Sequence, residues 1–78
     1  MIMSDEDRQA SVYKLYDAMG ILVYVGVSTH GMRTIQQDTQ TRPWWPEVAS
    51  VQVENFPTRK LAQDRERYLI INDQPRYN

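Results

Sequence analysis

The sequence of 78 residues contains no cysteine and only one histidine, His30. Disulfide bonds and thiolate metal sites are therefore excluded, and so is a zinc site built from several histidines. A metal ion bound by this chain would have to be a hard cation with oxygen ligands. We expect His30 to lie in a loop, because a lone histidine has no second histidine or cysteine with which to hold a metal.

Long hydrophobic runs are also missing. No apolar stretch approaches the length of a membrane span, and the first nine residues lack the basic and apolar regions of a signal peptide. The sequence therefore predicts a cytoplasmic protein with no membrane partner. The formal net charge of −1 gives no overall attraction to nucleic acid, but arginines can still gather on one face of the fold.

The hydrophobic pattern predicts one small α+β domain. Residues 1–10 are polar and acidic and are expected to fray, whereas residues 11–78 carry the domain. The order of the predicted elements is strand, strand, helix, strand, helix. This pattern indicates a ββαβα domain with a three-stranded antiparallel sheet flanked by helices. The boundaries are two strands at 11–16 and 21–27, a short helix at about 31–40, a strand within 47–56 and a helix from 58 to about 71.

The first two strands are expected to form a hairpin around the turn-like residues 17–20. With all four residues in the loop, Tyr16 pairs with Ile21, and Tyr13 lies directly opposite Tyr24. Cross-strand partners are about 4.5–5.5 Å apart at Cβ, so the two phenols share one face of the sheet. Two interpretations stay open: the tyrosines are core aromatics with hydroxyls at the rim, or they form a functional polar pair.

The helix before the third strand is predicted to be weak, with Ser28 or Thr29 as its cap. The segment that follows it contains two tryptophans, Trp44 and Trp45, between prolines. The pair either closes one end of a small core or offers a platform on which bases stack.

Glu66 is the unusual residue of the last predicted helix, which Thr58 is expected to cap. It falls on the same helical stripe as Ala62 and Leu69, although a carboxylate that faces a core must be paired, hydrogen-bonded or bound to a cation. A border position or an ion pair with an arginine explains Glu66 equally well.

Taken together, these polar residues resemble the signature of the GIY-YIG nuclease domain. The resemblance covers about residues 11–78, and the string from Arg42 to Val48 also looks like small single-domain members of that family. The matching positions are Ser11-Val12-Tyr13 for the first motif, Tyr24-Val25-Gly26 for the second, Arg33 after the hairpin, Glu66 in the last helix and Asn78 at the end.

The resemblance implies an endonuclease that hydrolyses phosphodiester bonds in nucleic acid, DNA in preference to RNA, with one divalent cation, Mg²⁺ or Mn²⁺. It also assigns roles to individual side chains. Glu66 would ligate the metal, Arg33 would hold the scissile phosphate, Tyr13 would be the general base, Tyr24 would position water or phosphate, and Asn78 would support the site. Lys14 and Gln37 are expected to join Arg33 in binding substrate.

A tyrosine can act as a base only where a nearby cation lowers its pKa from about 10. The chain also departs from the family pattern. Ser11 replaces a glycine, valines replace isoleucines at positions 12 and 25, and Gln37 stands where the family commonly has histidine or tyrosine. Glutamine cannot exchange a proton, and such a loss typically lowers the rate about 10²–10⁴-fold.

Two further interpretations follow from these departures. The chain is either a catalytically impaired, nuclease-like module that binds nucleic acid or a protein, or a small domain whose polar residues are structural. We expect target selection to be loose or to need a protein partner, because the chain has no room for a separate DNA-binding domain.

Overall fold

The computed structural model of the protein describes residues 9–78, apart from the side chains of residues 32–34. It confirms a small α+β domain with an antiparallel sheet in the strand order β2-β1-β3. The frayed tail predicted for residues 1–10 lies mostly outside the described residues, but Ala10 already belongs to the sheet and is buried. The elements are β1 (Ala10–Tyr16), β2 (Leu22–Ser28), α1 (Met32–Thr39), a short 3-10 helix η2 (Trp45–Glu47), β3 (Ser50–Phe56) and α2 (Arg59–Asp73).

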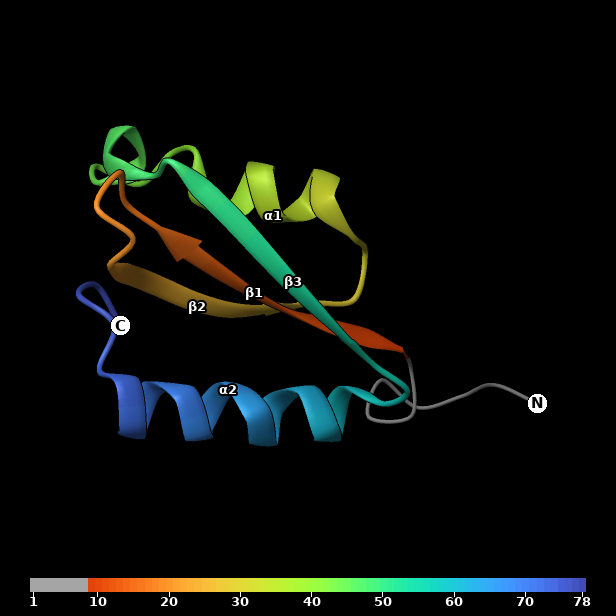
Figure 1. Ribbon diagram of the computed structural model, residues 1–78. Helices are drawn as coiled ribbons and strands as arrows, with labels where there is room; N and C mark the ends of the chain where they lie inside the picture. The colour runs from red at the N-terminus through yellow and green to blue at the C-terminus, as the bar shows by residue number, and fades with distance from the viewer. Residues whose placement is uncertain (1–8) are drawn as a thin grey trace.

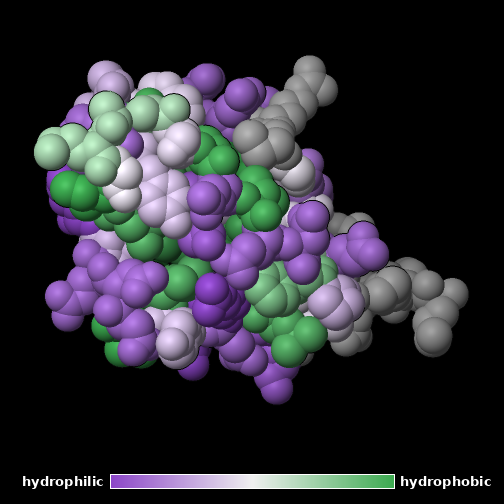
Figure 2. All heavy atoms as spheres, in the orientation of Figure 1, coloured by the Kyte–Doolittle hydropathy of each residue, from purple (hydrophilic) through white to green (hydrophobic). Residues whose placement is uncertain are grey.

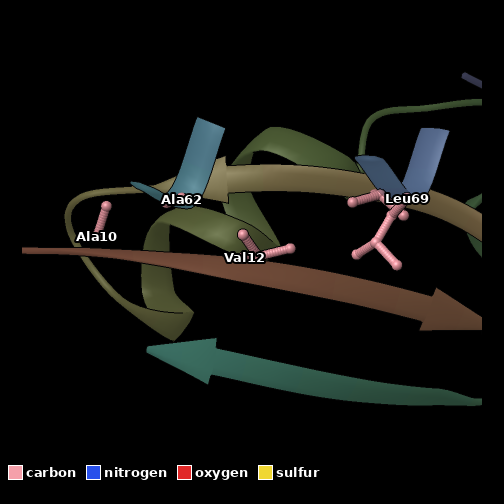
Figure 3. Packing of buried hydrophobic residues seen from close by; sticks show 5 residues of the cluster. Ala10, Val12, Ala62 and Leu69 are labelled. Atoms are coloured by element: carbon pink, nitrogen blue, oxygen red, sulfur yellow. The ribbon is translucent and has the colours of Figure 1, made fainter. Parts of the chain in front are cut away.

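The two helices cover opposite faces of the sheet, as Figure 1 shows. Because successive side chains of a strand point to opposite faces, β1 contributes to two cores. Val12 packs with Ala62 and Leu69 of α2 (Figure 3). Tyr13 and Leu15 instead pack with Ile35 of α1. The central strand therefore joins two small hydrophobic clusters.

The turn between β1 and β2 lies where the sequence predicts it. The Asp17 carboxylate accepts hydrogen bonds from the backbone N–H groups of Met19 and Ile21, both at 2.9 Å. Gly20 has a φ of 81°, a left-handed conformation that glycine adopts without a steric penalty.

The predicted pairing of the hairpin is wrong by two residues. Tyr13 lies opposite Gly26, and Leu15 lies opposite Tyr24. Two changes of one residue each add up to this shift: Tyr16 pairs with Leu22 instead of Ile21, and a bulge between Leu15 and Tyr16 leaves Val23 unpaired. Since the shift is even, the two tyrosines still share a face as diagonal neighbours.

The bulge also exchanges the faces of two residues in β2. Simple alternation along the predicted strand 21–27 would place Leu22 on the face of Tyr13 and Val23 on the other face. Val23 instead packs in the cluster on the α1 side, and Leu22 packs against the cluster on the α2 side.

The predicted N-terminal cap is confirmed for α2 but not for α1. Thr58 caps α2, with its side-chain oxygen accepting from the Leu61 N–H at 3.2 Å. The predicted cap of α1 is wrong: Gly31 occupies that position without a side-chain hydrogen bond. Ser28 instead donates to the Gly31 carbonyl at 3.3 Å and accepts from the His30 N–H at 3.2 Å. His30 lies in this loop, as predicted.

On the face shown in Figure 2, green hydrophobic side chains are interleaved with purple hydrophilic ones. None of the helices in the described part of the chain is long and apolar enough to cross a membrane.

Candidate active site at the edge of the sheet

A cleft of about 390 Å³ opens beside β2. Because β2 is an edge strand, side chains from both faces of the sheet meet there. The cleft therefore brings together Tyr13, Tyr24 and Glu66, which come from β1, β2 and α2. Its lining consists of Tyr13, Tyr24, Gly26, Val27, Asp38, Arg42, Arg59, Gln63 and Glu66.

The position of the Tyr13 phenol depends on Gly26. A Cβ atom at Gly26 would lie 2.2 Å from the Tyr13 hydroxyl oxygen, far inside van der Waals contact. Glycine is therefore needed here for the space it leaves, and the phenol crosses the strand at this point. The Tyr24 ring lies beside it, with ring centroids 6.1 Å apart. Tyr13 is 3% exposed, as the core-aromatic interpretation expects, and it also lines the cleft. A functional polar pair stays a prediction.

The surroundings of Tyr13 favour its neutral form. Burial raises the pKa of the phenol most, and the neighbouring Tyr24 and the negative charges of Asp38 and Glu66 raise it further. All of these influences act against the phenolate. Tyr13 can serve as a base only when a cation in the cleft opposes them, as the sequence argument required.

Glu66 lies at the border between the α2 core and the cleft. Its neighbours along the helix, Ala62 and Leu69, are buried in the core, whereas Glu66 itself is half-buried and lines the cleft. Burial raises the pKa of the Glu66 carboxyl. The border position that the helical pattern left open is therefore correct, and it directs the carboxylate to the tyrosines.

The donor set of the cleft is suited to a cation that the protein shares with its substrate. The described residues contain no group of three or more histidine, cysteine, aspartate or glutamate side chains that could hold a metal. Mg²⁺, however, is often bound through one or two carboxylates, with water and substrate phosphate as the other ligands. Glu66 fits that kind of site, and Asp38 lines the same cleft.

Asn78 supports the strand that carries the cleft. Its side-chain carbonyl accepts from the Val25 N–H at 2.7 Å, and its side-chain amide donates to the Val25 carbonyl at 2.9 Å. The Tyr77 N–H donates to the Val23 carbonyl at 2.8 Å. The end of the chain thus pairs with the outer edge of β2. Asn78 holds Val25, which lies between Tyr24 and Gly26.

The tryptophans close one end of the core, which confirms the simpler of their two interpretations. Both are half-buried and pack against the cluster on the α1 side. Trp44 is stacked on Tyr77 with ring centroids 5.3 Å apart, and its ring lies 5.0 Å from that of Tyr24. These contacts occupy Trp44, so it is not a free platform for bases.

The three residues predicted to bind substrate, Lys14, Gln37 and Arg33, differ in where the structure places them. Lys14 faces α2, where it pairs with Glu54 at 2.8 Å, and it does not line the cleft. Strand alternation points Lys14 away from Tyr13, and its role in binding substrate stays a prediction. Gln37 is exposed on α1 and does not line the cleft either. Arg33 belongs to α1, but its side chain lies outside the described residues.

The cleft also contains polar and charged residues for which the sequence predicted no role. Gln63 lies three residues before Glu66 in α2, and Arg59 lies four residues before Gln63, so the three share one stripe and helical periodicity could have identified them. Asp38 and Arg42 have no such local signal. They reach the cleft through the packing of α1 on the sheet.

Comparison with known proteins found no match: no protein-family model, no curated protein and no solved structure is significantly similar to the chain. The function must therefore be argued from the cleft.

Proposed function

We propose that the protein is a minimal endonuclease of the GIY-YIG type, which hydrolyses phosphodiester bonds in nucleic acid, preferentially DNA, with one Mg²⁺ or Mn²⁺ ion. The observation that carries this proposal is the meeting of Tyr13, Tyr24 and Glu66 at one polar cleft. They come from three elements, and Glu66 lies in the helix that covers the opposite face of the sheet from the tyrosine side chains.

The chemistry of phosphodiester hydrolysis suits this arrangement. A divalent cation held by Glu66 would stabilise negative charge on the phosphate oxygens and lower the pKa of groups beside it. The Tyr13 hydroxyl would orient the attacking water and, as the phenolate, accept its proton. Tyr24 would hold water or phosphate next to it, and Asn78 would keep β2 in place through its two hydrogen bonds to Val25.

A second candidate is a nuclease-like module that binds nucleic acid or a protein without turnover. The raised pKa of Tyr13 favours this alternative, because a neutral phenol can hydrogen-bond a phosphate but cannot accept a proton. The position of Gln37 outside the cleft favours it too. A cytoplasmic location and a protein partner for target selection belong to both proposals.

Nicking of supercoiled plasmid in the presence of Mg²⁺ tests the proposed activity. We expect Tyr13→Phe to lower the rate about 10²–10⁴-fold, as is typical for the loss of an acid–base group. Glu66→Gln should also lower the rate strongly, because it removes the carboxylate proposed to hold the cation. Asp64→Asn on the exposed side of α2 and Tyr16→Phe on β1 are matched controls, since neither residue lines the cleft. Both should cleave at the wild-type rate.

Equal cleavage by the wild type and all four variants would identify a contaminating nuclease and contradict the proposal. Absence of cleavage by every protein, together with retained binding of DNA, would favour the binding module.

A further inference from the structure

Two arginines in the cleft, Arg42 and Arg59, receive no role from the resemblance to the nuclease family. They come from different segments: Arg42 follows α1, and Arg59 is the first residue of α2. Figure 1 shows α1 and α2 on opposite faces of the sheet, and residues from the end of α1 and from the start of α2 both line this one cleft. Glu66 lies on the same stripe of α2 as Arg59, and the tyrosines line the same cleft from β1 and β2.

The backbone of each arginine is held in place. The Arg42 N–H donates to the Thr39 carbonyl at 3.0 Å, and the Arg42 carbonyl accepts from the Trp45 N–H at 3.0 Å. Thr39 is 1% exposed, so this support belongs to the packed interior. Arg59 begins the helix that Thr58 caps. The backbone that carries each guanidinium group is therefore fixed by hydrogen bonds.

The charges of the cleft show what these arginines can do. Two arginines and two carboxylates, Asp38 and Glu66, line it, so the formal charges of these four side chains cancel. A phosphate chain entering such a cleft needs cationic contacts close to its own oxygens, and guanidinium groups provide these with bidentate geometry.

We propose that Arg42 and Arg59 bind the backbone phosphates on either side of the scissile phosphate, so that the protein engages nucleic acid independently of base sequence. The inference rests on the proposed function, because it takes the position of Glu66 and the tyrosines as the place of the scissile bond. The aromatic contacts agree with this: the Trp44 ring is stacked on Tyr77 and lies beside Tyr24, so it is used in packing within the fold.

The test measures binding of two short DNA duplexes of unrelated sequence over a range of salt concentrations. All variants carry Glu66→Gln, which removes the carboxylate proposed to hold the cation, so that binding is recorded without cleavage. Each phosphate contact contributes about 0.9 to the slope of log affinity against log salt. We expect Arg42→Gln and Arg59→Gln each to reduce the magnitude of the slope by about 0.9, the contribution of one phosphate contact. The reduction should be equal for both duplexes.

Two controls separate a specific contact from a change in net charge or folding. Lys60→Gln makes the same charge change next to Arg59 but lies about 100° round the helix, and Lys60 does not line the cleft. Its slope should stay at the parent value. Arg42→Lys and Arg59→Lys should restore most of the slope, and thermal melting should show that all variants remain folded.

The possible failures are distinct. Unchanged slopes for both glutamine variants, in a protein whose wild type cleaves in a Glu66-dependent manner, would overturn the inference and leave the proposed function standing. Reduced slopes without any cleavage by the wild type would support the phosphate contacts and contradict the enzyme. A loss confined to one duplex would overturn sequence-independent binding.

Discussion

Glu66 is the residue at which stability and the proposed activity conflict. Its helical position would suit an apolar side chain, because its neighbours Ala62 and Leu69 are buried. The carboxyl is half-buried instead, and burial raises its pKa above the ordinary value of 4.5. The protonated form is thus favoured in the folded protein relative to the unfolded chain. A group of this kind contributes stability below its unfolded pKa and loses that contribution as the pH rises through the folded pKa.

We therefore expect Glu66→Gln to raise the melting temperature at neutral pH. The gain should shrink as the pH falls and should vanish below the unfolded pKa of about 4.5, where both carboxyl and amide are neutral. Thermal unfolding of both proteins across this pH range measures the effect. Asp64→Asn on the exposed side of the same helix is the control and should show no such dependence. A difference that is constant with pH would contradict the argument.

At the scale of elements, the end of the chain behaves as an additional partner of β2. Arg76 pairs with Glu47 at 2.9 Å and with Asp17 at 3.3 Å, and Tyr77 donates a hydrogen bond to Glu47. Exposed ion pairs of this type contribute little to stability. The hydrogen bonds of Asn78 to Val25 differ, because they satisfy backbone groups on an edge strand beside the cleft.

Replacing Asn78 by alanine should destabilise the protein by about 1–3 kcal/mol, since each hydrogen bond contributes roughly 0.5–1.5 kcal/mol. Amide hydrogen exchange at Val25 should accelerate, and plasmid nicking should slow because Tyr24 and Gly26 are adjacent. Asn72→Ala removes one exposed hydrogen bond to the Tyr68 carbonyl and should leave Val25 exchange unchanged. Equal acceleration of Val25 amide exchange by the two substitutions would show that Asn78 has no special role in holding β2.

At the scale of the whole molecule, two cores depend on one strand. Leu15 is buried on the α1 side and Leu69 on the α2 side, and β1 takes part in both clusters. A chain of 78 residues has a free energy of unfolding of only about 4–12 kcal/mol at the usual stability per residue. The loss of one core should therefore unfold the other.

Leu15→Ala and Leu69→Ala should each cost about 2–5 kcal/mol. In both variants, urea unfolding followed by tryptophan fluorescence and by far-ultraviolet circular dichroism should give coincident transitions. The tryptophans report on the α1 side, and α2 is the longest helix in the described part of the chain. Separate transitions for the two signals would mean that the two layers fold independently.

The local elements could be predicted because their signals are short-range. β-branched residues favour β1 and β2, Asp17 and Gly20 favour a turn, and the Thr58 side chain satisfies the first N–H groups of α2. The stripe that holds Glu66 follows in the same way from helical periodicity. All of these interactions involve residues within a few positions of each other, so the order of side chains along the chain was enough to find them.

The pairing of the strands and the composition of the cleft were decided by the tertiary structure. Tyr13 lies opposite Gly26 instead of Tyr24 because the turn is one residue longer than predicted and a bulge beside it absorbs one more residue. The periodicity of either strand alone reveals neither change. Asp38 and Arg42 joined Glu66 because β2 forms the edge of the sheet, where side chains from both faces can meet. Such meetings depend on how distant faces pack, and short-range preferences carry no information about that packing.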